Sequence, residues 1–172
     1  MADLTPELQQ LVDEAAIRKV LVRYSRAIDR LDWDLLRTCY HPDAIDDHGL
    51  YRGDVEGFID LLKVKLPLDE STTHFLGNQE IELEGDVAFA ETACVARHRR
   101  PAADGAPAND YFGFLRYCDR FERRDGEWRI AHRVVVYEPG RVDDVAGEPA
   151  YTDRHTRNIR EAAPGGLLRP GH

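Results

Sequence analysis

The hydrophobic pattern of this chain changes its period once, and that change constrains the fold more than any other feature of the sequence. Before Pro67, apolar residues recur every three or four positions, as they do along one face of a helix. After Pro67 they alternate with polar residues, as in strands with one buried face. A chain with helices first and strands afterwards is typical of an α+β fold, with the helices on one side of a curved, mainly antiparallel sheet.

Three helices are predicted in the first part of the chain. After a frayed lead-in over residues 1–10, the first helix runs from Asp13 to Leu31 with a continuous apolar stripe. Asp32 has the position of an N-cap for a short second helix, because its carboxylate can accept from backbone N–H groups of the first turn. Residues 53–63 form the third helix.

Four strands follow, near residues 72–84, 86–99, 110–123 and 127–138. Glycine-containing turns at residues 84–86 and 124–127 join them as hairpins. We therefore expect one domain over residues 1–140. Residues 141–172 form a C-terminal tail rich in proline and glycine, with one or two helical turns around residues 151–161.

The overall charge limits the classes of partner. The formal net charge is −9 and the isoelectric point is about 5.2, which disfavours nucleic acids and anionic membrane surfaces because both require a basic face. No apolar run approaches the roughly 20 residues that span a bilayer, and the N-terminus lacks the pattern of a secretory signal. We expect a cytoplasmic protein that binds neither nucleic acid nor membrane.

The cysteines and one acidic cluster bear on metal binding. Cys39, Cys94 and Cys118 are too far apart for a typical disulfide or zinc pattern, and the last two lie in apolar strand patterns as small core residues. His41-Pro-Asp-Ala-Ile-Asp-Asp-His48-Gly contains several potential ligands, but at no known ligand spacing. We interpret it as a short strand and a turn rather than a metal site.

The sheet pattern leaves the character of its inner face open. One face of residues 86–99 carries small residues and then His98, beside a run of arginines that we interpret as a solvated strand end. The small residues indicate either space for a ligand or a sheet pressed closely against a helix. His132 is expected to be a structural core residue on the same side of its strand as Trp128 and Ile130.

Asp29 and His74 are the leading candidates for chemistry. Asp29 lies at the end of the first helix, about 100° round from Ile28, at the border of the apolar stripe. A carboxylate beside an imidazole fixes the tautomer and stabilises the charged form, which suits acid–base catalysis. The simpler alternatives are a carboxylate satisfied by backbone N–H groups and a histidine buried in the sheet.

Several stretches in order resemble one family. They are Ala16-Ile-Arg, residues 24–33, His41-Pro-Asp-Ala-Ile, Tyr51-Arg-Gly, Thr73-His-Phe-Leu-Gly-Asn and Asp125-Gly-Glu-Trp-Arg-Ile. The chain resembles the SnoaL-like branch of the nuclear transport factor 2-like superfamily, which includes scytalone dehydratase and bile-acid 7α-dehydratase. The resemblance implies a cone-shaped α+β barrel around an apolar pocket, assembled as a homodimer or homotrimer.

The resemblance also implies site residues. In its eliminating members an aspartate matching Asp29 orients a histidine of the sheet, which matches His74 in some enzymes and His98 in others. Which of these two pairs with Asp29 stays open. Tyr24 matches a tyrosine proposed to act in the bile-acid enzyme. In this chain we expect Tyr24 to donate to a developing oxyanion or to assist a leaving hydroxyl, and His98 to relay the leaving-group proton.

The implied function is a cofactor-independent lyase of dehydratase type, or an isomerase, acting by Asp/His proton abstraction on a hydrophobic cyclic or polycyclic small molecule. No metal and no organic cofactor are required. The same family also implies two alternatives. One is a non-catalytic binding or assembly subunit, such as the small subunit of a ring-hydroxylating dioxygenase, and the other is a polyketide cyclase. The fold does not choose among them.

Overall fold

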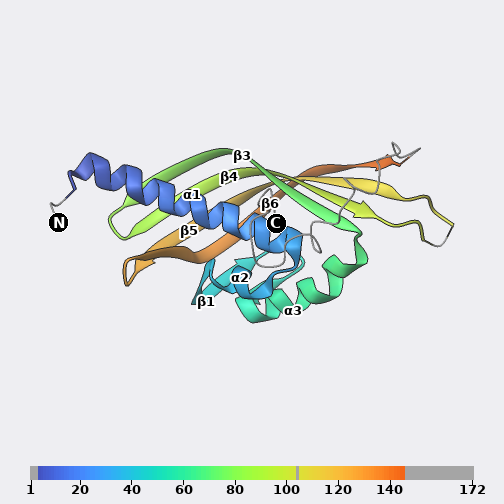
Figure 1. The fold of residues 1–172 in the computed structure, drawn as a ribbon, viewed down its shortest axis with the longest axis horizontal. Helices are drawn as coiled ribbons and strands as arrows, with labels where there is room; N and C mark the ends of the chain where they lie inside the picture. Colours follow the sequence, from blue (N-terminus) through green and yellow to red (C-terminus); the bar gives the residue numbers. More distant parts are fainter. Residues whose placement is uncertain (1–3, 104, 146–172) are drawn as a thin grey trace, which may run out of the picture.

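A computed structural model describes residues 4–103 and 105–145, and its three helices come before its four long strands, with two shorter strands between the second and third helices (Figure 1). This order confirms the predicted α+β class. The elements are α1 (Pro6–Arg30), α2 (Trp33–Arg37), β1 (Tyr40–Asp47), β2 (Arg52–Asp54), α3 (Val55–Lys65), a 3₁₀ turn η1 (Leu66–Leu68), β3 (Ser71–Glu84), β4 (Val87–Arg100), β5 (Asn109–Arg124) and β6 (Glu127–Asp144).

The first helix begins earlier than its apolar stripe predicts. Thr5 caps α1 by accepting a hydrogen bond from the Leu8 N–H at 3.4 Å, and Pro6 fills the first turn, where a missing N–H costs nothing. The expected lead-in is therefore wrong from residue 6 onward. At the other end, Leu31 adopts a left-handed conformation (φ 55°) that terminates α1, and Asp32 caps α2 as predicted, with its carboxylate 3.0 Å from the Leu35 nitrogen.

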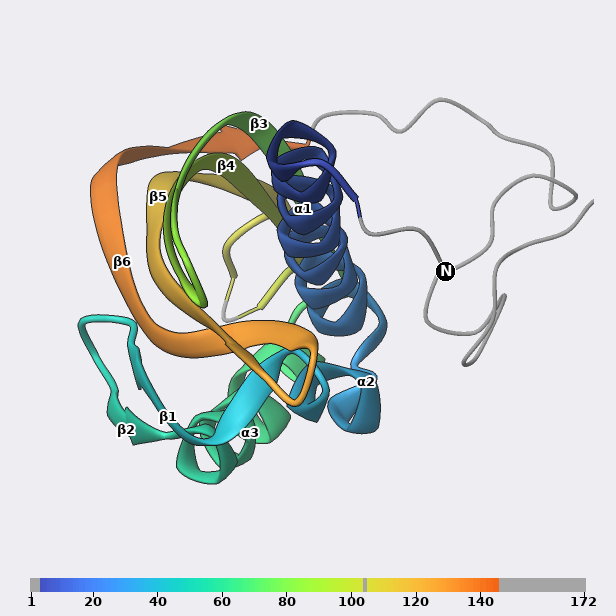
Figure 2. The same ribbon diagram turned by 90° about the vertical axis from the view of Figure 1, so that its left-hand side faces the viewer.

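The six strands form one sheet in the order β2-β1-β6-β5-β4-β3. The β1–β6 pairing is parallel and the other pairings are antiparallel. Viewed along its length, the sheet curls round, α1 covers its open side, and α2 and α3 lie on one side of the curl, next to β1 (Figure 2). The expected cone-like arrangement is thus confirmed. None of the described helices is both long and apolar enough to cross a membrane.

A bulge in β6 changes which side chains face the core. Arg120 pairs with His132 and Phe121 pairs with Ile130, so Ala131 is an extra residue that reverses the alternation. Trp128 and Ile130 are buried as expected, but Arg133 rather than His132 continues their side of the strand. The prediction of His132 as a core residue is therefore wrong, because strict alternation does not hold across the bulge.

The last strand also continues further than expected. β6 ends at Asp144 rather than near residue 138, so residues 141–144 belong to the sheet and not to the expected tail. The remainder of the tail, including the helical turns expected around residues 151–161, lies outside the described residues. Cys94 is buried as predicted, whereas Cys118 is only partly buried because its position on β5 faces away from the core.

Candidate functional site

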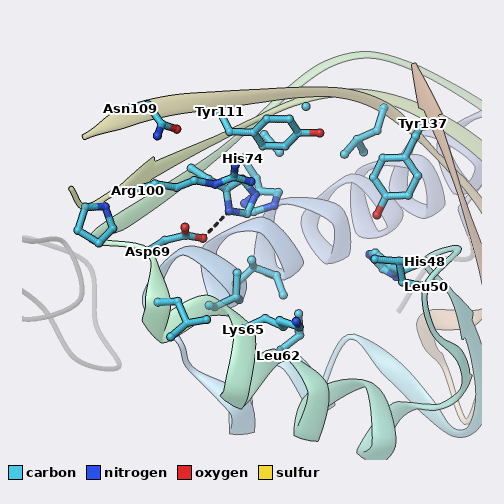
Figure 3. A pocket seen from close by; sticks show the side chains of 18 of the residues that line it. His48, Leu50, Leu62, Lys65, Asp69, His74, Arg100, Asn109, Tyr111 and Tyr137 are labelled. Atoms are coloured by element: carbon cyan, nitrogen blue, oxygen red, sulfur yellow. Dashed lines mark hydrogen bonds and ion pairs between the residues drawn. The ribbon is translucent and has the colours of Figure 1, made fainter. Parts of the chain in front are cut away.

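A cavity of about 790 Å³ lies between the curved sheet and the helices (Figure 3). Its walls are mainly apolar and include Ile28 of α1, Phe58 and Leu62 of α3, and Leu115 and Tyr117 of β5. Exposed lining residues mark its open side: Leu50, Lys65, Leu68 and Arg100. A cavity of this size and character is typical of sites that enclose a small organic molecule.

Asp29 and His74 form a two-point contact at the edge of this cavity. The His74 backbone N–H donates to Asp29 Oδ2 at 3.0 Å, and His74 Nδ1 lies 2.8 Å from Asp29 Oδ1. The two side chains are only 18% and 8% exposed, respectively. An ionised carboxylate accepts hydrogen bonds and donates none, so Nδ1 carries the proton and Nε2 is left as a base. Asp29 and His74 are 45 positions apart in the sequence, and they are in contact because α1 packs beside β3.

His98 has a different partner, which answers the question left open by the sequence. His98 Nδ1 lies 2.7 Å from Oδ2 of Asp69, a residue between η1 and β3, and Figure 3 shows the Asp69 carboxylate with a dashed line to its partner. The His98 ring also meets the His74 ring edge to face, with 5.8 Å between centroids. Both histidines line the cavity from neighbouring strands. Asp29 therefore pairs with His74 and not with His98.

Tyr24 lines the same cavity from α1, and its hydroxyl has a partner that the sequence did not suggest. The Tyr24 hydroxyl oxygen lies 3.3 Å from His48 Nε2, and burial raises the pKa of Tyr24 while the nearby Arg133 charge opposes the rise. The phenol is therefore protonated at neutral pH. A protonated phenol at a cavity wall is a hydrogen-bond donor or a proton source.

His48 is itself oriented by a buried carboxylate. Its Nδ1 makes a short contact to Asp46 Oδ1, and Asp46 Oδ2 accepts from the Tyr40 hydroxyl at 2.6 Å. The stretch over residues 41–49 is a strand followed by a turn, as predicted, although the strand is longer than expected. Within it, Asp46 and His48 bind each other. The two-residue spacing was visible in the sequence, but no pattern indicated that this strand end faces the cavity.

Arg133 and Asp119 form a buried ion pair behind two aromatic residues of the cavity wall, Tyr24 and Tyr117. Arg133 donates to both oxygens of Asp119 at 2.7 Å, and both side chains are fully buried. The Arg133 guanidinium also lies 4.0 Å from the centres of the Tyr24 and Tyr117 rings, a cation–π sandwich. Its Nη1 has no hydrogen-bond partner among the described residues. This pair therefore packs directly against Tyr24, a residue of the cavity wall.

The small residues on one face of β4 allow close packing at one end of the strand and leave space for a ligand at the other. The sequence had left these two alternatives open. Ala88 and Thr92 are buried in the packed part of the sheet, whereas Ala96 lines the cavity directly opposite His74 in the ladder. The short alanine side chain thus leaves room beside the candidate base.

The arginines near His98 are not a simple solvated edge, contrary to the sequence prediction. Arg97 and Arg99 both pair with Asp110 on β5 at 2.8 Å. Arg100 stacks on the Tyr111 ring and lines the open side of the cavity. In the described part of the chain, no three carboxylate, imidazole or thiolate groups converge as metal ligands.

Comparison with other proteins gives the family. The model of the SnoaL-like domain matches residues 9–134. The uncharacterized protein Rv2910c of Mycobacterium tuberculosis is 30% identical over 129 residues, which cover 73% of this chain and 85% of that protein. A protein of Mycobacterium bovis, Mb2934c, matches with the same values.

Solved structures share the fold at low identity. A type 2 hexachlorocyclohexane dehydrochlorinase (LinA) superposes with a TM-score of 0.74 at 20% identity, covering 84% of this chain and 98% of that one. A putative scytalone dehydratase of Novosphingobium aromaticivorans gives 0.66 at 18%, covering 86% and 97%. A putative aromatic ring hydroxylase of the same organism gives 0.68 at 18%, covering 77% and 94%. Together with the domain match, these findings establish that the chain belongs to the SnoaL-like domain family.

Proposed function

We propose that this protein is a lyase or isomerase that removes a proton from carbon in a hydrophobic cyclic or polycyclic substrate, with elimination of water as the leading reaction. The observation that carries the proposal is the Asp29–His74 pair at the wall of an apolar cavity of about 790 Å³. Neither a metal nor an organic cofactor takes part in the proposed reaction.

The chemistry follows from the orientation of the imidazole. Asp29 holds the His74 Nδ1 proton, so Nε2 is the nitrogen available to accept a proton from substrate carbon. The carboxylate then stabilises the imidazolium that forms. Apolar walls exclude water from this interaction and so strengthen it. A positioned base of this kind contributes about 10²- to 10⁴-fold to a rate.

Two further groups complete the proposed site. Tyr24 and His98 both line the cavity, and each is a candidate for returning a proton to the leaving oxygen. Tyr24 donates from α1, and His98, held by Asp69, would donate from the same side of the cavity as His74.

Carbon-bound proton exchange tests the proposal before the natural substrate is known. The probe is 2-tetralone in D₂O, and the measurement is deuterium incorporation at C3 by NMR, corrected for the uncatalysed rate. We expect catalysed exchange in the wild type, and at least a tenfold loss in both His74→Gln and Asp29→Asn. His132→Gln is the matched control, because His132 lies in a separate groove.

Absence of exchange in the wild type, or a loss below tenfold in both variants, contradicts the proposal. Thermal melting of each variant shows whether a lost rate reflects the site or an unfolded chain.

A non-catalytic binding or assembly subunit is the second candidate. It is favoured by the fold shared with the putative aromatic ring hydroxylase, although the identity supports the fold alone. Co-purification with a large oxygenase subunit, without exchange activity, would establish it. A polyketide cyclase uses the same type of base, and only screening of poly-β-ketone substrates separates it from a dehydratase.

We also propose that the chain assembles as a homodimer or homotrimer. Phe75 of β3 is largely exposed and shares a shallow groove with Val95 and Phe114 of the neighbouring strands. Such an apolar surface on a sheet is typical of contacts between subunits. Sedimentation velocity of wild type and Phe75→Asp tests this, with a shift toward monomer expected in the variant.

A further inference from the structure

A third carboxylate–imidazole pair, after those of His74 and His98, lies at the cavity and has no role in the reaction proposed above. Asp46 and His48 lie at the end of β1, two residues apart. The Asp46 side chain is fully buried, and the His48 side chain is only 16% exposed. His48 stacks on Phe58 with 4.3 Å between ring centres and lines the cavity. Figure 3 shows it beside Leu50 and Tyr137, away from His74.

The contacts around this pair form a chain of proton-carrying groups. Asp46 accepts from the Tyr40 hydroxyl and from His48 Nδ1. The opposite nitrogen, His48 Nε2, is the atom that meets the Tyr24 hydroxyl. A buried carboxylate behind an imidazole fixes its orientation and stabilises its charged form. When His48 is charged, Nε2–H donates to the Tyr24 oxygen and leaves the Tyr24 O–H free to point into the cavity.

We propose that Asp46, His48 and Tyr24 are the acid side of the active site, where Tyr24 protonates the leaving hydroxyl and His48 replaces the Tyr24 proton. Tyr24 is the catalytic residue of this set because it meets the substrate, and His48 and Asp46 act through it. The inference rests on the proposed function and deepens it, since it assigns the acid and the base to separate groups.

The step balances as follows. His74 Nε2 takes a proton from the carbon next to the substrate carbonyl, and the electrons of that C–H bond become the new carbon–carbon double bond. The C–O bond at the next carbon breaks, and its oxygen takes the Tyr24 hydroxyl proton. Tyr24 takes the Nε2 proton of His48 at the same time. The products are an unsaturated ketone and water, and His74 and His48 return to their starting states by exchange with solvent.

The acid and the base reach the cavity from different elements. Tyr24 belongs to α1, whereas His74 belongs to β3, and both line the cavity. A substrate between them can therefore contact the acid and the base with different atoms. Elimination requires this arrangement, because the hydroxyl and the proton leave from neighbouring carbons.

His98 is the competing acid, and its position argues against it. It lies on the strand next to His74, and its ring contacts the His74 ring. A proton donor there shares one side of the substrate with the base. Tyr24 and His48 instead approach from α1 and β1.

Two reactions of one enzyme test the inference. Exchange of 2-tetralone at C3 requires the base, whereas dehydration of 4-hydroxy-2-tetralone to fluorescent 2-naphthol requires the base and the acid. Both rates are measured for wild type, His48→Gln, Tyr24→Phe, Asp46→Asn, His98→Gln and His74→Gln, with His132→Gln as the control. Thermal melting confirms that each variant is folded.

In His48→Gln and Tyr24→Phe we expect the ratio of dehydration to exchange to fall about 100-fold, and by less in Asp46→Asn. A purely structural role lowers both rates together and leaves the ratio unchanged. An unchanged ratio in both variants, or a selective loss in His98→Gln alone, overturns the inference while the proposed function stands. If His74→Gln retains both rates, the proposed function itself is wrong, whatever His48 does.

Discussion

The Arg133–Asp119 pair and the Asp29–His74 pair both lie near the cavity, and they differ in how completely the protein encloses them. Arg133 and Asp119 are fully buried, with two hydrogen bonds between them and two aromatic rings over the guanidinium. Asp29 and His74 are also close together, but both remain partly exposed and His74 lines the cavity. One pair is sealed inside the fold, and the other is open on the side where a substrate would bind.

Because of this difference in enclosure, one pair should matter mainly for folding stability and the other mainly for reactivity. A sealed pair cannot meet a substrate, and removal of one partner leaves the other charge in a medium that solvates it poorly. An open pair regains water when it is broken, so its loss costs less folding free energy. We therefore expect substitutions in the sealed pair to act on folding and substitutions in the open pair to act on turnover.

The largest effect on folding is expected for Asp119→Asn. The Arg133 charge then loses its partner, which typically costs about 3–5 kcal/mol of unfolding free energy. Urea denaturation measures this loss. The double substitution Arg133→Met with Asp119→Leu should regain a large part of it, because no unpaired charge remains. A loss below about 1 kcal/mol in the single variant would show that the pair is not sealed in solution.

Asp29→Asn is expected to have the opposite profile. It weakens the contacts to the His74 backbone and ring, at a cost of about 1–2 kcal/mol in unfolding free energy. The same urea denaturation, combined with the exchange assay, should show at least a tenfold loss of rate in a chain that is still folded. If stability falls as far as in Asp119→Asn, the two pairs do not differ as proposed.

The thiol of Cys94 reports on how well the enclosed region excludes water. Burial raises the pKa of Cys94 from 9.0 to about 11, although a hydrogen bond with Tyr117 opposes the rise. The neutral thiol is therefore favoured by the fold, and this contribution to stability is complete below pH 9 and lost as the pH rises through about 11.

At pH 8 we expect iodoacetamide to label Cys94 about 100-fold more slowly than a free cysteine, because the thiolate is the reactive form. Mass spectrometry of the labelled peptides measures the rate, and Cys118 is the partly buried internal reference. Equal labelling of the two cysteines would indicate that the region opens.

The smallest effect is expected for an exposed pair. Arg37 contacts both carboxylate oxygens of Glu56, at 2.7 and 2.9 Å, but both side chains are solvent-exposed. Pairs of this kind contribute little, because water and salt screen them. Glu56→Gln should leave the melting temperature and the exchange rate unchanged within error. A clear decrease would mean that exposure is a poor guide to the importance of a pair in this protein.

The sequence predicted the elements better than the contacts between them. The change of hydrophobic period located three helices and four long strands, and the family resemblance placed Asp29 near a histidine of the sheet. Neither feature decided whether His74 or His98 pairs with Asp29, because the pairing depends on how α1 packs beside β3. The partner of His98, Asp69, lies after a 3₁₀ turn, whose direction no periodicity reveals.

The contacts that the sequence missed have a common physical origin. Asp46 and His48 looked like turn residues, since nothing local shows that β1 runs parallel to β6 and ends at the cavity. The buried Arg133 was missed because a long charged side chain is a poor candidate for the core. Both depend on tertiary packing rather than on local preference.

The extra residue in β6 makes the inner wall depend on the bulge itself. If the strand became regular with Ala131 still in it, strict alternation would turn His132 inward and Arg133 outward. The sealed pair would then be lost, and an imidazole would replace the guanidinium behind Tyr24. Deletion of Ala131 would instead remove the bulge and keep Arg133 inward, because His132 and Arg133 would then follow Ile130 in regular alternation. The geometry of one bulged residue thus decides whether the wall behind Tyr24 carries a permanent charge.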